Sequence, residues 1–276
     1  MSRYIVPFYY VAISRLPTHL KQVSWPMLYH VPLFLVVCQI STASLPDLLP
    51  AFALALSVFY GVYEIGHIQN DVRTIRTEVD PTLRLDATRR DWLDRHFWAV
   101  AMGRVALAAV FFVCLWGFGR VRGLELHVDL FAFLIGVSAL VFHLHNTVRG
   151  AANNLTFFSL MVLKYAAPVL LFTGWTPAGR DAAVVCTVMF PICRSLETAS
   201  ANYSLFGRKD FIHDPHRFRV FYYLAVFAGV LLARATGLDL AVLSLPASRS
   251  LLLGMSAYFL VYRLAAFVVS QQMPTD

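Results

Sequence analysis

The chain has 276 residues, of which 58% are hydrophobic and 14% charged, and its mean hydropathy is +0.63. This balance excludes an ordinary water-soluble fold, and an aromatic content of 14% excludes an intrinsically disordered chain. A net charge of +7 would suggest a nucleic-acid partner for a soluble domain. Because the basic residues fall mostly between apolar runs, we interpret them as topology signals and anion contacts and expect no nucleic-acid partner.

A membrane-spanning helix needs about 20 mostly apolar residues, and eight such runs are found in this sequence. The sequence therefore predicts an all-α, polytopic membrane protein with a single transmembrane domain over residues 1–276. Residues 1–24, which precede the first run, are polar and rich in aromatic side chains, and we expect an interfacial segment there. A short run, Leu238–Leu245, could complete a ninth, broken span. The eight runs are Trp25–Ile40, Leu49–Ile68, Trp98–Phe118, Val128–His143, Leu155–Phe172, Asp181–Ala199, Phe218–Thr236 and Leu251–Val269.

The distribution of Lys and Arg predicts the orientation in the membrane. Most of these residues lie in the N-terminal segment and in the connections after the second, fourth and sixth runs. By the positive-inside rule, both termini are then cytoplasmic. The two long polar loops, residues 69–97 and 201–218, face the same side, and we expect the active site there.

The second run ends in a polar stripe that could bind a metal ion. Glu64, Asp71 and Glu78 are spaced by two helical turns, and Asn70 shares their face. Carboxylate and amide oxygens at a helix end suit Mg²⁺, which takes one or two carboxylates and leaves its other positions to water and phosphate. A helix end that has simply reached water is the alternative.

A second cluster follows the sixth run. Arg194 and Glu197 are three residues apart and should pair on one helix face. In the following loop, Asp210 and Asp214 could hold a second cation, and Arg208 could bind phosphate oxygens. The alternative is a solvated connector with interface arginines.

Two basic residues in the middle of the chain also point to an anion. Lys164 lies within the fifth run, and Arg149 follows the fourth. A lysine within a membrane span either neutralises a carboxylate or meets an anionic ligand, and we favour the ligand.

The string Asn70-Asp71-Val72-Arg73-Thr74-Ile75-Arg76-Thr77-Glu78 resembles the NDxxDxxxD motif of the UbiA superfamily of intramembrane prenyltransferases. Asp80-Pro81-Thr82-Leu83-Arg84 is similar to the His-Pro-Thr-Lys-Arg of the branch that acts on polyprenyl phosphates. Arg15-Leu16-Pro17-Thr18-His19-Leu20-Lys21, Arg194-Ser195-Leu196-Glu197 and Arg219-Val220-Phe221-Tyr222-Tyr223 resemble further motifs of that branch. Thr74 and Glu78 stand where the family has Asp, and the second Asp-rich motif is absent in its usual form.

The resemblance implies a ring of helices around a central lipid-accessible cavity. It also implies a Mg²⁺-dependent enzyme that ionises an allylic prenyl diphosphate and transfers the prenyl group to a small acceptor. Asp71, Glu78 and Glu197 would then be catalytic, and Asn70, Asp71, Glu78, Asp210 and Asp214 would hold Mg²⁺. The substrate would be bound by Tyr63, Arg84, Arg149, Lys164, Arg194 and Arg208.

Other functions remain open on the same scaffold. One is a UbiA-type terpene cyclase, and another is phosphoribosyl-type transfer onto polyprenyl phosphate. A histidine-box membrane oxygenase is suggested by His143-x-His145 and His213-x-x-His216. A non-catalytic lipid-binding relative is the last alternative.

Overall fold

The structure is a computed structural model, and it describes residues 2–77, 82–148, 150, 152–202, 210–237, 243 and 245–272. The described secondary structure is entirely helical, and eight helices are long and apolar enough to cross a membrane. The protein is therefore an integral, multi-pass, all-α membrane protein, which confirms the prediction from the sequence. The possible ninth span, Leu238–Leu245, lies mostly outside the described residues.

The chain forms two compact units, and α8 (Ala152–Thr173) contributes to both. The first unit comprises Met1–Arg149 with Ala167–Gly174, and the second comprises Gly150–Ala166 with Trp175–Asp276. The other helices of the first unit are α1 (Ser2–Ile5), α2 (Tyr9–Arg15), α3 (His19–Ile40), α4 (Leu45–Val72), the 3₁₀ turn η1 (Thr74–Thr77), α5 (Ala87–Arg95), α6 (Phe97–Arg122) and α7 (Val128–Thr147). Those of the second unit are α9 (Pro177–Thr187), the π-helical turn η2 (Val188–Ile192), α10 (Cys193–Asn202), α11 (Pro215–Thr236) and α12 (Pro246–Gln272).

Most helices extend a few residues beyond the predicted apolar runs. α3 begins at His19 because the Thr18 hydroxyl accepts a hydrogen bond from the Lys21 backbone N–H, at 3.3 Å, and so caps the helix. α4 continues past Ile68 to Val72, so the polar stripe predicted at its end is helical as far as Asp71.

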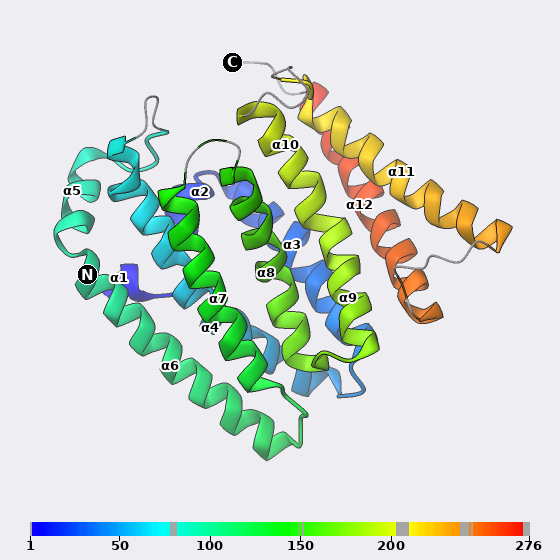
Figure 1. Ribbon diagram of the computed structural model, residues 1–276, viewed down its shortest axis with the longest axis horizontal. Helices are drawn as coiled ribbons and strands as arrows, with labels where there is room; N and C mark the ends of the chain where they lie inside the picture. Colours follow the sequence, from blue (N-terminus) through cyan, green and yellow to red (C-terminus); the bar gives the residue numbers. More distant parts are fainter. Residues whose placement is uncertain are drawn as a thin grey trace. The chain divides into compact units, whose positions relative to one another are not determined.

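α4 is the central helix of the first unit. In its most apolar stretch, 61% of α4 is buried, compared with 28% of α6 and 17% of α7. Both α6 and α7 pack against α4 (Figure 1). Gly61 permits the close approach of α6, since a Cβ at this position would lie 3.0 Å from Ala108 Cβ. The polar residues of α4 are therefore held inside the unit.

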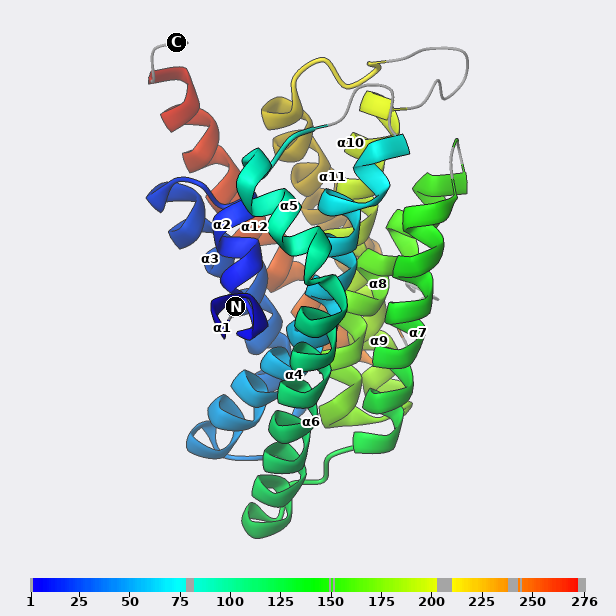
Figure 2. The same cartoon turned by 90° about the vertical axis from the view of Figure 1, so that its left-hand side faces the viewer.

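The N-terminal helices are packed into the first unit. Figure 2 shows α1 and α2 beside α5, where the Tyr4 ring stacks on Trp92 at a centroid distance of 5.5 Å. Tyr10 of α2 is fully buried in a cluster with Ile68, Val72 and Leu93. This packing brings α2 against the polar end of α4.

The second unit contains an interrupted span. The π-helical turn η2 separates α9 from α10 and contains Pro191, which has no backbone N–H to donate. The Tyr222 and Tyr223 hydroxyls of α11 donate to the carbonyls of Val188 and Met189, at 2.5 and 2.7 Å. These bonds fasten α11 to the interrupted span, and α12 runs beside α11 (Figure 1).

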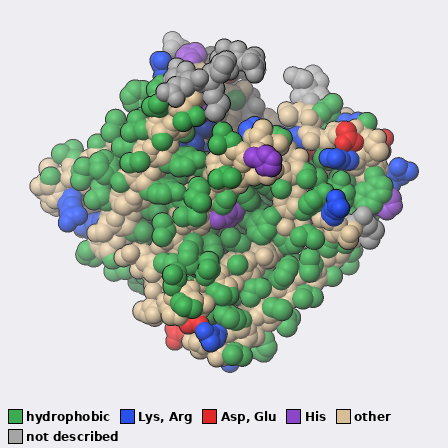
Figure 3. All heavy atoms as spheres, turned by 180° about the vertical axis from the view of Figure 1, so that it is seen from behind, with side chains coloured by type: hydrophobic (Ala, Val, Ile, Leu, Met, Phe, Trp, Pro, Cys, Tyr) green, Lys and Arg blue, Asp and Glu red, His purple; other side chains and the backbone are tan. Residues whose placement is uncertain are grey.

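Large apolar side chains are exposed along the spans. Val113 of α6 and Phe133 of α7 are 63% and 65% exposed, and Figure 3 shows hydrophobic side chains over most of one face. Such a surface would be unfavourable in water. It is the surface expected of helices that face lipid.

Candidate functional site

Asp71, the central residue of the predicted metal site, lies at the end of α4 and is only 2% exposed. Its carboxylate accepts a 2.7 Å hydrogen bond from the Tyr10 hydroxyl. It also accepts from Arg15 Nη2 at 3.2 Å and from Arg84 Nη1 at 3.1 Å. We call these four residues the Asp71 cluster.

The members of the Asp71 cluster come from three parts of the first unit. Arg15 is the last residue of α2, and Arg84 lies in the segment that precedes α5. Arg15 Nη1 is buried and has no hydrogen-bond partner among the described residues. Two guanidinium groups thus share one carboxylate, which leaves a net positive charge and an unused donor.

Burial shifts the pKa values of Tyr10 and Arg15, the two members of the cluster that belong to α2. Desolvation, assisted by the nearby Asp71 charge, raises the pKa of Tyr10 far above its ordinary value. Desolvation also lowers the pKa of Arg15, and the Asp71 carboxylate opposes this shift. Tyr10 is therefore a neutral donor at physiological pH.

The donors placed around Asp71 fit an anion rather than Mg²⁺. The predicted metal ligand Asn70 directs its Nδ2 at Asp71 Oδ1, at 3.4 Å, and the predicted ligand Glu78 lies outside the described residues. A dication at Asp71 would meet the like charges of Arg15 and Arg84. Within the described part of the chain, no three His, Cys, Asp or Glu side chains are grouped so that they could hold a metal.

Glu64, which the sequence placed on the same polar stripe, has a structural role. It is fully buried and accepts from Arg104 Nη1 at 2.7 Å. Its other bonds come from the backbone N–H groups of Phe8 and Val11, at 3.0 and 2.8 Å. Glu64 therefore caps the N-terminus of α2 and holds this helix over the end of α4.

Aromatic side chains lie close to the Asp71 cluster. The Tyr63 ring contacts His67 and Phe142, with centroid distances of 5.3 and 4.8 Å, and Arg15 Nη2 lies 3.3 Å from His67 Nδ1. Phe142 packs directly on Gly66, where a Cβ would fall 2.3 Å from the ring. The predicted substrate-binding residue Tyr63 thus lies near the Arg15 guanidinium and packs against the Phe142 ring.

The Glu197 carboxylate, in the second unit, also pairs with two arginines. It accepts from Arg194 Nη1 at 2.5 Å, as the spacing predicted, and from Arg219 Nε and Nη2 at 2.5 and 2.9 Å. Arg194 also lies within electrostatic range of the predicted substrate-binding residue Lys164. The bidentate Arg219 contact joins α10 to α11 and was not anticipated from the sequence.

The predicted cation ligands Asp210 and Asp214 both lie in the segment that precedes α11. Asp214 caps α11, because Oδ1 accepts from the backbone N–H groups of His216 and Arg217 at 2.8 and 3.1 Å. Asp210 has a φ of 53°, and its N–H donates to the Ser200 carbonyl. The sequence Asp-Pro before an apolar run is itself a helix-start signal.

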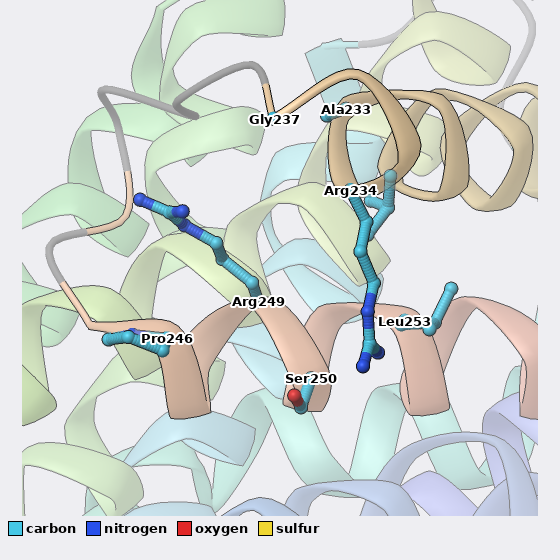
Figure 4. A pocket seen from close by; sticks show the side chains of 8 residues that line it. Ala233, Arg234, Gly237, Pro246, Arg249, Ser250 and Leu253 are labelled. Atoms are coloured by element: carbon cyan, nitrogen blue, oxygen red, sulfur yellow. The ribbon is translucent and has the colours of Figure 1, made fainter.

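Two other predicted phosphate-binding residues, Arg149 and Arg208, lie outside the described residues. The described histidines form no histidine-box cluster. A pocket of about 260 Å³ lies between the end of α11 and the start of α12, where Figure 4 shows Arg234 and Arg249 among its lining residues. The sequence analysis had not singled out this pocket.

No family model, curated protein or solved structure matches this chain.

Proposed function

We propose that this protein is an intramembrane transferase of the UbiA type that acts on the phosphate end of an isoprenoid. The observation that carries the proposal is the Asp71 cluster, in which Arg15 and Arg84 share one buried carboxylate inside a multi-pass membrane protein. Arginine is suited to phosphate because its planar guanidinium presents paired donors. An isoprenoid would place its charged end at these arginines and its chain among the apolar spans.

In the proposed reaction, the bond between C1 of an allylic prenyl diphosphate and its bridging oxygen breaks, and the electron pair leaves with the diphosphate. Arg15 and Arg84 stabilise the negative charge that develops on this leaving group. The aromatic faces of Tyr63 and Phe142 tolerate the allylic cation. A small acceptor then forms the new bond to C1, and its proton passes to the departing diphosphate.

Asp71 orients the two arginines in this account, and the Tyr10 hydroxyl holds the carboxylate in place. No step is assigned to Mg²⁺, because the described donors at Asp71 do not fit a dication. Turnover with and without a chelator tests whether Mg²⁺ is required.

A second candidate is phosphoribosyl-type transfer onto a polyprenyl phosphate. It is favoured by the second unit, where three residues that resemble motifs of that branch, Arg194, Glu197 and Arg219, form one ion-pair network. Tyr223 of the same motif is bonded to the Met189 carbonyl. In this reaction the isoprenoid phosphate is the acceptor rather than the donor.

Both candidates are tested by incubating membranes that contain the protein with a labelled allylic diphosphate, or with polyprenyl phosphate and phosphoribosyl diphosphate. Product in the first mixture supports prenyl transfer, and product in the second supports the alternative. Asp71→Ala should abolish either product, and unchanged turnover in this variant would remove Asp71 from the mechanism. We place the active site and both termini on the cytoplasmic side, as the positive-inside rule predicts.

A further inference from the structure

The second unit contains a pocket of about 370 Å³ between α8 and the η2–α10 segment, and neither proposed reaction uses it. Its lining is mostly apolar, with two polar residues, Asn154 and Ser195. The volume lies within the range of small-molecule sites, and the pocket is open to its surroundings, since Leu155 is 67% exposed. The apolar lining residues are Leu155, Phe158, Ile192, Leu196 and Ala199.

Ser195 brings an unused hydroxyl to this pocket. The residue is only 8% exposed, and its Oγ has no hydrogen-bond partner among the described residues. Hydroxyls inside helices usually bond to the carbonyl four residues earlier, as Ser159 and Thr198 do in this chain, at 2.9 Å each. Four residues before Ser195 is Pro191, which belongs to the π-helical turn η2. The π turn changes the local helix geometry, and turns of this kind frequently occur at functional sites.

Asn154 supplies a second unused oxygen. Its Oδ1 is buried and has no hydrogen-bond partner among the described residues. A buried polar atom without a partner costs about 1–3 kcal/mol. An amide oxygen only accepts hydrogen bonds, whereas a serine hydroxyl can donate or accept. A single hydroxyl group could satisfy both atoms by donating to Asn154 and accepting from Ser195.

We propose that this pocket binds a neutral, largely apolar alcohol or phenol, whose hydroxyl donates to Asn154 Oδ1 and accepts from Ser195 Oγ. The ligand is neutral because none of the residues that line the pocket is charged. Its remaining surface is hydrocarbon or aromatic, to match Leu155, Phe158 and Leu196. This binding site stands independently of the transferase reaction.

The proposal is tested on the purified full-length protein with a long-chain alcohol that carries a photoactivatable diazirine. We expect labelling of peptides from α8 and α10 that contain the pocket residues. Dodecanol should compete with the probe about tenfold better than dodecyl methyl ether, which accepts but cannot donate a hydrogen bond. Equal competition by dodecane and dodecanol, or labelling elsewhere, would show a non-specific hydrocarbon groove and overturn the proposal.

Variants give a second readout. Asn154→Leu and Ser195→Ala should each reduce labelling about 2–10-fold, by the loss of one hydrogen bond. Ser159→Ala is the matched control, because its hydroxyl lies on α8 but bonds to the Leu155 carbonyl and does not line the pocket. Unchanged labelling in both pocket variants would contradict the assignment. Because no isoprenoid is present, alcohol binding without transferase activity would leave this site standing and reject only the proposed reaction.

Discussion

Arg104 Nη1 donates a 2.7 Å hydrogen bond to Glu64 Oε2, and both side chains of this ion pair are completely buried. The pair joins α6 to α4, and the same carboxylate caps α2. The position of Arg15, and with it the Asp71 cluster, therefore depends on an ion pair elsewhere in the first unit.

Replacing Glu64 by Gln should strongly destabilise the protein. Breaking a buried pair costs about 3–5 kcal/mol, because Arg104 is left as an uncompensated buried charge. Glu64→Gln combined with Arg104→Met should restore much of the loss, since no charge remains buried. Thermal unfolding in detergent measures both effects, and a single variant as stable as the wild type would show that the pair is not buried.

Gly66→Ala should also destabilise the first unit, by about 1–3 kcal/mol. The new Cβ would fall 2.3 Å from Phe142, so the ring must leave its place. Phe142→Leu in the same chain should recover stability by removing part of the obstruction. The thermal midpoints of the single and double variants measure this coupling, and additive losses would contradict direct contact between the two residues.

Tyr10→Phe should lower stability at neutral pH by about 1.5–3 kcal/mol, because a hydrogen bond to a charged group is lost. The folded state raises the pKa of Tyr10, so its contribution is present in full below about pH 10 and declines at higher pH, as tyrosine ionises in the unfolded chain. The stability difference between the wild type and Tyr10→Phe should therefore shrink above about pH 10. A difference that grows with pH would contradict a neutral, buried Tyr10.

Two substitutions distinguish a helix-capping role of Asp214 from a role in cation binding. Asp214→Ala should cost about 1 kcal/mol, whereas Asp214→Ser should retain most of the stability and activity, because serine also caps helices. Activity lost equally in both variants, with stability intact, would indicate cation binding instead.

The sequence predicted the eight spans well, because each depends on a local apolar run. The interaction partners of the site residues were harder to predict from the sequence. Asp71 meets Arg15 across 56 positions, and only the docking of α2 brings them together. The pairing of Arg194 with Glu197 was predicted because three residues separate them on one helix, but Arg219 joins from another helix. The cap formed by Asp214 could have been recognised from the proline that follows it.

The central claim is that Arg15 and Arg84, held by Asp71, bind the phosphate end of an isoprenoid. The most direct measurement is the binding of labelled farnesyl diphosphate to purified wild type, Arg15→Gln and Arg84→Gln, with Arg89→Gln as control. Arg89 is an exposed arginine of α5 that pairs only with Asp86 among the described ion pairs. Each cluster variant should weaken binding about tenfold or more, by the loss of a charge-assisted hydrogen bond, while the control binds like the wild type. Unchanged affinity in both Arg15→Gln and Arg84→Gln would contradict the account.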